Sequence, residues 1–166
     1  NFSEINNSIY VFKQKIFYYK FNLLYEKSKW IGTKAIKKKN LKSPQWLRNI
    51  KGKNYSRWRL DTLFSNKKYS NLRFIDDGGW HFTFLKTPEQ IQKKLLNFAH
   101  HFEFEQSGLK IDDIKRLVAE KKAIYDYEVD RTKSKWLGTT KLKNVEVNLL
   151  PEYVFSNLEK FKDWID

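Results

Sequence analysis

The stretch DDGGWHFTFLKTPEQ, residues 76–90, contains the signals of a turn, a strand and a helix start in direct succession. Two glycines after two acids predict a turn, because glycine adopts positive φ angles at little cost. The aromatic residues of 80–85 predict a strand. Thr87, followed by Pro88 and Gln90, has the pattern of a helix N-cap with a capping box. This stretch therefore predicts a strand that leads directly into a helix.

Strand and helix signals also alternate on both sides of this stretch. Residues 17–24 and 71–75 have the composition of strands, and residues 30–36 are a shorter candidate. Further helices are predicted after Ser43-Pro44, over 111–121 and after Pro151. This alternation indicates an α/β fold. We expect residues 17–24, 71–75 and 80–85 to form one mixed sheet, flanked by the helices that start near Pro88 and Ile111.

Composition limits the class of protein. The chain has 166 residues, of which 40% are hydrophobic, and this is enough for a folded core in one domain, residues 1–166. It has no run near the roughly 20 apolar residues of a membrane-spanning helix, and no Cys for disulfides or thiolate chemistry. Lys greatly outnumbers Arg, which is typical of AT-rich bacterial genomes. Because the chain begins with Asn1 and contains no Met, we expect it to be part of a longer protein.

The net charge of +14 favours anionic partners, namely nucleic acid, an anionic membrane surface or a phosphorylated small molecule. Residues 27–60 contain twelve Lys and Arg and no acid, with aromatic residues between them. This pattern permits a basic nucleic-acid-binding domain, in which bases stack on aromatic rings, or a simple solvated lysine-rich face. We expect residues 27–60 to face a membrane or a nucleotide diphosphate and not a buried core, and Trp46, Trp58 and Trp164 to pack in a core or at its edge.

The turn and strand at residues 76–81 also carry the side chains best suited to chemistry. An acid could remove a proton from an acceptor hydroxyl, and Trp80 could offer a flat apolar face to a sugar ring. His81 could ligate a metal or hydrogen-bond to a phosphate. The alternative is a plain turn with solvated acids and a core tryptophan.

These residues resemble glycosyltransferase family 17, which includes the β-1,4-mannosyl-glycoprotein N-acetylglucosaminyltransferases. The resemblance extends over nearly all of the chain and in the same order. Its central part is Gly79-Trp80-His81, Thr83, Thr87-Pro88-Glu89, Ile91, Lys94-Leu95, Ala99-His100 and Glu103. Its outer parts are Tyr18-Tyr19, Phe21-Asn22, Trp30-Ile31-Gly32, Pro151, Tyr153, Asn157 and Phe161.

The resemblance implies the acceptor-side, C-terminal half of a GT-A-type fold. It implies inverting transfer of N-acetylglucosamine, or a similar sugar, from a UDP-sugar to a glycan acceptor. It also implies a divalent cation, Mn²⁺ or Mg²⁺, bound mostly by an N-terminal half that carries an Asp-x-Asp-type motif. No such motif precedes Ile16 here, so we expect this portion to be inactive alone.

Partners and location follow from the resemblance together with the charge of the chain. The expected partners are a UDP-sugar and a glycan, with a peripheral contact to an anionic membrane and no nucleic acid. The expected location is the cytoplasm or inner-membrane surface of a bacterium, or the Golgi lumen of a eukaryote. Charge reversal at Lys37, Lys38 and Lys39 is expected to weaken membrane association more than UDP-sugar affinity.

Site roles are assigned from the resemblance and the chemistry together. Asp77 is the expected catalytic base, with Asp76 and Glu89 as alternatives, and His81 is the expected metal ligand. Asp77, Trp80 and His81 are expected to converge on one cleft. Arg48 and Lys94 are expected to hold the diphosphate, and His100 and Glu103 to line the acceptor site. The full set of expected substrate-binding residues is Arg48, Gly79, Trp80, Lys94, His100 and Glu103.

Overall fold

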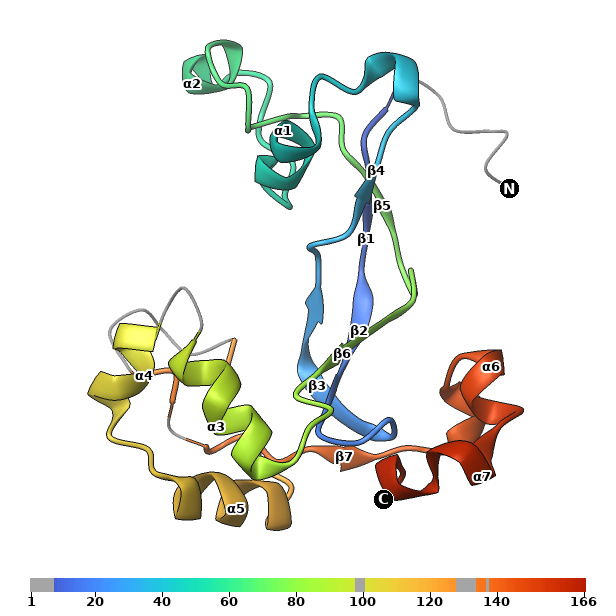
Figure 1. The fold of residues 1–166 in the computed structure, drawn as a ribbon. Coiled ribbons are helices and arrows are strands. Elements are labelled where there is room, and N and C mark those ends of the chain that lie inside the picture. The colour runs from blue at the N-terminus through green and yellow to red at the C-terminus, as the bar shows by residue number, and fades with distance from the viewer. Residues whose placement is uncertain (1–7, 98–100, 128–133, 137) are drawn as a thin grey trace. The chain divides into compact units, whose positions relative to one another are not determined.

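The structure is a computed structural model that describes residues 8–97, 101–127, 134–136 and 138–166. The chain forms two compact units (Figure 1), each made from two separate segments. The first unit comprises Asn1–Gln14 and Lys29–Gly79, and the second comprises Lys15–Ser28 and Trp80–Asp166.

The first unit contains a small mixed sheet. Strand β1 (Tyr10–Phe12) lies at its centre, antiparallel to β4 (Lys34–Ala35) and parallel to β5 (Arg73–Ile75). The helical segments of this unit are η2 (Lys38–Asn40), α1 (Pro44–Asn49) and α2 (Leu60–Leu63). Its core consists of Ile9, Val11, Ile50 and Leu72, with Ile36, Trp46, Leu47, Tyr69 and Phe74 packed against them.

The helix predicted after Ser43-Pro44 is confirmed as α1. The Ser43 hydroxyl accepts a hydrogen bond from the Trp46 backbone N–H at 3.0 Å, which satisfies one of the free donors at the helix start. Trp46 packs against the core, as expected. The basic strip 27–60 is mostly at the surface, but Ile50 within it is buried, because it supplies part of that core.

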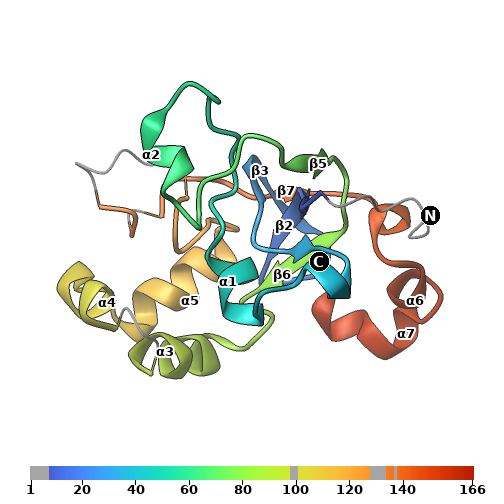
Figure 2. The same ribbon diagram turned by 90° about the horizontal axis from the view of Figure 1, so that it is seen from above.

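The second unit contains a four-stranded mixed sheet in the order β6-β2-β3-β7. Strand β2 (Gln14–Tyr18) runs parallel to β6 (Trp80–Thr83), and β3 (Leu23–Trp30) runs antiparallel to β7 (Lys143–Asn144). Helices α3 (Pro88–Leu96), α4 (His101–Ser107) and α5 (Ile111–Ala119) lie on one side of this sheet in Figures 1 and 2. On the other side lie η3 (Val147–Leu149), α6 (Glu152–Phe155), α7 (Leu158–Phe161) and η4 (Lys162–Trp164).

The α/β class is confirmed, with two mixed sheets flanked by helices. The expectation of one mixed sheet is wrong, because β5 pairs in the first unit while β2 and β6 pair in the second. The expected strand 17–24 is also wrong as a single strand. The chain leaves the extended conformation at Tyr19, whose φ is 61°, so β2 ends at Tyr18 and β3 begins at Leu23.

The helices predicted at Pro88 and Ile111 are confirmed as α3 and α5. At α3 the capping box is complete: the Thr87 hydroxyl accepts from the Gln90 N–H at 3.4 Å, and the Gln90 side chain accepts from the Thr87 N–H at 3.3 Å. After Pro151, two four-residue helices, α6 and α7, replace the single helix that was expected. Over the described ranges, none of the helices is long and apolar enough for a membrane crossing.

Three tyrosines join the two segments of the second unit. The Tyr18 hydroxyl donates to the Tyr125 carbonyl at 2.8 Å, and the Tyr19 hydroxyl donates to the Lys122 carbonyl at 2.9 Å. The Ile124 N–H donates to the Tyr19 oxygen, and the Tyr25 hydroxyl donates to Asp126. Burial raises the pKa of both Tyr18 and Tyr19, so both hydroxyls stay protonated donors at neutral pH.

Asn22, at the turn between β2 and β3, ties that turn to the end of the chain. Its side-chain N–H₂ donates to Asn144 at 2.9 Å and to the Asp166 carbonyl at 3.1 Å, and its side-chain oxygen accepts from the Asp166 N–H at 2.8 Å. Asn22 is buried, so removing its amide leaves these contacts without a replacement partner.

We therefore expect Asn22→Ala to lower the free energy of unfolding by about 2 kcal/mol in urea titrations. The control is Asn148→Ala, because Asn148 is exposed and its side chain donates a local hydrogen bond to Glu146 at 2.9 Å. Equal stability of the two variants would contradict the role given to Asn22.

Candidate functional site

The turn at residues 76–79 is built by packing and local bonds within the first unit. Asp76 pairs with the Lys13 ammonium at 2.9 Å, and the Gly78 N–H donates to the Lys13 carbonyl at 2.9 Å. A Cβ atom on Gly78 would lie 2.7 Å from the Phe12 Cβ, so only glycine fits there. Asp77 adopts a φ of 48°, which Asp tolerates better than most residues. The paired acids and glycines are therefore accounted for by turn geometry.

The strand β6 directs its successive side chains to opposite faces of its sheet. Phe82 stacks near Phe17 and Phe21, with ring centroids 5.4 and 5.0 Å away, on the side of α6 and α7. Trp80 lies on that same face, half-exposed, and its indole N–H donates to the Leu149 carbonyl at 2.7 Å. His81 lies on the other face, which α3 covers. The structure thus does not bring Trp80 and His81 together on one side of the sheet.

His81 lies in a positively charged environment. Burial lowers the pKa of His81, and the charge of Lys94 on α3 lowers it further, so the imidazole is neutral at pH 7. The pKa of Lys94 is itself lowered, first by burial and then by the charge of Lys86. The Lys94 ammonium also lies over the Phe84 ring, 4.6 Å from its centroid. We call His81, Lys86 and Lys94 the cationic cluster.

This cationic cluster suits an anion better than a cation. A metal ion at the His81 imidazole would be repelled by Lys94, whose charge already opposes protonation of that ring. Among the residues that the structure describes, no group of three or more His, Asp and Glu side chains is placed to hold a metal. The expected metal-ligand role of His81 therefore does not fit its surroundings.

Glu89 has a structural place at the start of α3. Hydrogen bonds from its own backbone N–H and from Thr87 lower its pKa, with a further contribution from Lys115, which it approaches at 3.4 Å. A carboxylate with a lowered pKa is a weaker base, and negative charge is favourable at a helix N-terminus. These contacts support the structural reading of Glu89 over the catalytic one.

The remaining expected residues are spread over both units. Arg48, Asp76, Asp77 and Gly79 belong to the first unit, whereas Trp80, His81, Glu89, Lys94 and Glu103 belong to the second. Arg48 is exposed on α1, and Glu103 is exposed on α4. His100 and its neighbour Ala99 lie outside the described residues. The cluster of His81 and Lys94 is thus the part of the expected site that the structure assembles within one unit.

The second unit contains a buried carboxylate, Asp126, that is not among the residues expected from the sequence. Asp126 is 1% exposed and accepts hydrogen bonds from the Tyr25 hydroxyl at 2.5 Å and from the Thr140 hydroxyl. Lys27 approaches its other oxygen at 3.2 Å. The sequence feature that could have indicated a buried Asp126 is its position between two tyrosines, Tyr125 and Tyr127, but this stretch shows no clear periodicity. This network holds the fold of the unit that carries the cationic cluster.

Comparison with known proteins identifies no relative of this chain. No family model matches the chain, and searches of curated proteins and of solved structures find no similar protein.

The electrostatic coupling within the cationic cluster can be measured directly. We expect Lys94→Gln to raise the pKa of His81 part of the way toward 6.5, because it removes the repulsion but leaves the burial. The measurement is an NMR titration of the His81 ring protons. Lys93→Gln, an exposed neighbour on the same helix, is the control and should leave the His81 pKa unchanged.

The same pKa has a consequence for stability. Because folding lowers the His81 pKa, the unfolded chain binds the extra proton more readily, and stability falls as the pH drops below about 6.5. This acid sensitivity should be smaller in Lys94→Gln than in Lys93→Gln. An unchanged His81 pKa in Lys94→Gln would show that the two groups are not coupled.

The Asp126 network predicts a large loss of stability. Asp126→Ala leaves the buried Tyr25 and Thr140 hydroxyls without this acceptor, so we expect a loss of about 2–4 kcal/mol in urea unfolding. In a double-mutant cycle, Tyr25→Phe should cost much less in the Asp126→Ala background than in the original chain. Additive effects would show that the Tyr25–Asp126 bond contributes little.

Proposed function

We propose that this chain carries the acceptor-side part of an inverting glycosyltransferase. In this proposal, the cationic cluster binds the diphosphate of a nucleotide sugar, and the transferred sugar is N-acetylglucosamine or a similar sugar. The proposal combines the resemblance of residues 79–95 to glycosyltransferase family 17 with the α/β class of the fold. The observation that carries it is the neutral, half-buried His81 next to Lys94 of α3, whose ammonium lies over the Phe84 ring and is itself close to Lys86.

The chemistry of sugar transfer requires such a cluster. As the bond between the sugar and the diphosphate breaks, negative charge grows on the leaving phosphate. Two ammonium groups, Lys86 and Lys94, would attract that charge, and a neutral imidazole would donate an N–H to a phosphate oxygen. Lys94 is partly desolvated against Phe84, so its charge is screened less than that of a fully solvated lysine.

Proton removal from the acceptor hydroxyl is assigned to an acid of residues 76–89. Asp77 stays the proposed base. Asp76 is the alternative and ranks second because it pairs with Lys13. Glu89 ranks below both because its carboxylate is engaged at the start of α3. The divalent cation implied by the resemblance is not assigned to the described residues, and no step is drawn through it. The glycan acceptor and a cytoplasmic or membrane-surface location also remain part of the proposal.

The cluster can be tested by binding alone, since the resemblance places the nucleoside contacts in the half that precedes these residues. We expect inorganic pyrophosphate and UDP-N-acetylglucosamine to shift the NMR signals of His81 and to raise its pKa, because a bound anion favours the protonated ring. Lys94→Gln should weaken pyrophosphate binding about tenfold, as measured by the same titration. Lys93→Gln is again the matched control.

The outcomes separate this proposal from the alternative of a nucleic-acid-binding domain. Pyrophosphate binding that Lys93→Gln and Lys94→Gln weaken equally would reflect general charge and would refute the cationic cluster as a site. Salt-sensitive binding of single-stranded oligonucleotides, with no effect of pyrophosphate on His81, would favour the alternative.

A further inference from the structure

The first unit exposes a group of large apolar side chains that its core does not use. Trp58 is 94% exposed, Phe64 91%, Leu60 74% and Leu63 71%, and all four lie within or beside α2. The expectation that Trp58 packs in a core or at its edge is therefore wrong. Single exposed apolar residues are common, but four in seven positions indicate an interaction surface.

The same segment is strongly basic. Residues 51–70 contain six Lys and Arg and one acid, which gives a net charge of +5. The single acid, Asp61, is neutralised locally, because Arg59 pairs with it at 2.9 Å and Lys68 at 2.5 Å. These two bonds lower the Asp61 pKa far below its ordinary value, so it stays paired in its charged form near neutral pH. The segment therefore presents positive charge around apolar groups.

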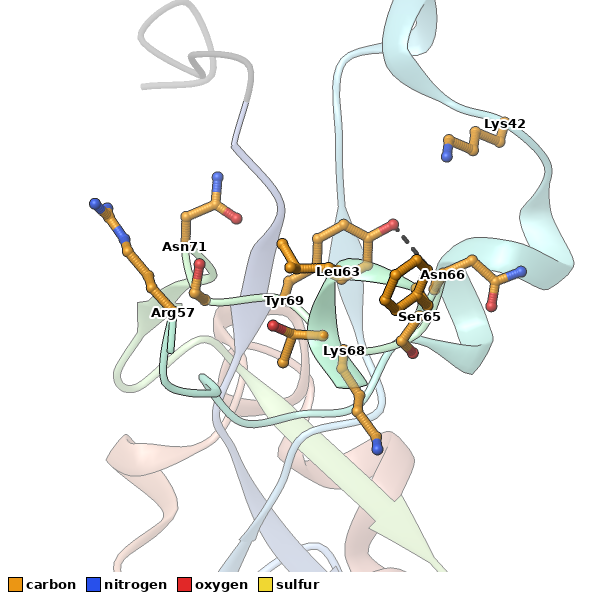
Figure 3. Close-up of a pocket in the computed structure, with 11 residues that line it drawn as sticks. Lys42, Arg57, Leu63, Ser65, Asn66, Lys68, Tyr69 and Asn71 are labelled. Atoms are coloured by element: carbon orange, nitrogen blue, oxygen red, sulfur yellow. Dashed lines mark hydrogen bonds between the residues drawn. The ribbon is translucent and has the colours of Figure 1, made fainter. Parts of the chain in front are cut away.

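A cavity of about 600 Å³ lies at this segment. It is lined by cations, namely Lys42, Arg57 and Lys68, and by hydrogen-bonding side chains such as Ser65 and Asn66. Figure 3 shows Arg57 and Lys42 on opposite sides of it, and Leu63 and Phe64 belong to its lining as well. We call residues 51–70 together with Lys42 the basic-apolar surface.

We propose that the basic-apolar surface binds the surface of an anionic phospholipid bilayer. Trp58, Leu60, Leu63 and Phe64 enter the headgroup and upper acyl region, and Lys42 and Arg57 pair with lipid phosphates at the cavity. The interface of a bilayer is where aromatic and leucine side chains gain from leaving water while neighbouring cations remain with anionic headgroups. This inference rests on the exposed side chains and cations of the first unit and does not use the cationic cluster or the sugar-transfer reaction.

The two leucines favour lipid over nucleic acid. Single-stranded nucleic acid gains affinity from aromatic rings that stack on bases, and Trp58 and Phe64 could serve it. Leu60 and Leu63 have no aromatic face, yet they are exposed to a similar degree. An acyl boundary buries all four side chains, so it accounts for the whole set.

The test is co-sedimentation of the 166-residue chain with vesicles. We expect binding to vesicles of phosphatidylglycerol and phosphatidylcholine, and at least about tenfold weaker binding to phosphatidylcholine alone. An excess of soluble glycerol phosphate should not release the chain, because it offers the phosphate without the acyl region. Release by glycerol phosphate would overturn the lipid assignment and make the cavity a site for free phosphate compounds.

Paired variants separate the apolar from the charged contribution. Trp58→Ala with Phe64→Ala should lower partitioning at least about tenfold, since both aromatic side chains leave water when the surface is bound. Phe102→Ala with Tyr153→Ala removes two exposed aromatic residues from the other unit and should have little effect. Arg57→Gln with Lys67→Gln should lower partitioning about fivefold per charge, against little change for Lys93→Gln with Lys162→Gln.

All these positions are exposed, so the variants should keep the far-UV circular dichroism of the original chain. Equal losses in each test pair and its control would show that binding reflects overall charge and would overturn the proposal. The proposal would also be overturned if the chain bound single-stranded oligonucleotides through Trp58 and Phe64 and did not bind anionic vesicles.

Discussion

Three buried tyrosine hydroxyls, on Tyr18, Tyr19 and Tyr25, bond to the stretch 122–126, about a hundred residues further along the chain. The second unit is made from two separate segments, and these bonds fix one against the other. Each hydroxyl has lost its water, so it needs its partner, and the partner carbonyls and the Asp126 carboxylate likewise need their donors. The aromatic rings supply the apolar burial at the same contacts, with Tyr18 surrounded by Tyr19, Tyr25, Phe84 and Tyr127.

The cationic cluster depends on this arrangement. Strand β6 pairs with β2 in a fixed register, with Ile16 opposite His81, so the position of β2 sets the direction of the imidazole. The capping box at Thr87 then starts α3 four residues after β6 ends, and Lys94 follows two turns along that helix. A short, well-capped connection thus places a lysine beside a half-buried histidine. The lowered pKa values of His81 and Lys94 follow from this packing, because both side chains are partly buried and lie close to a positive charge.

The two units concentrate positive charge in different ways. In the second unit, burial and the charge of Lys94 lower the pKa of His81, and burial and the charge of Lys86 lower the pKa of Lys94. In the first unit, the basic residues of 51–70 remain solvated around exposed apolar side chains, and Asp61 is held by Arg59 and Lys68. The first arrangement suits a compact anion such as a diphosphate, whereas the second suits an extended anionic surface with an apolar layer.

Local signals in the sequence were sufficient for the turn at 76–79, the strand that begins at Trp80, and the helices at Pro44, Pro88 and Ile111, because glycine, proline and capping residues act on their nearest neighbours. They also singled out His81 and Lys94. The tertiary structure alone decided that 71–75 and 80–83 pair in different sheets, that Tyr19 breaks the expected first strand, and that Trp80 and His81 face opposite sides. It also decided that Asp126 is buried and Trp58 exposed. These outcomes depend on contacts between residues far apart in the chain, and neither residue type nor spacing encodes which distant partner a side chain meets.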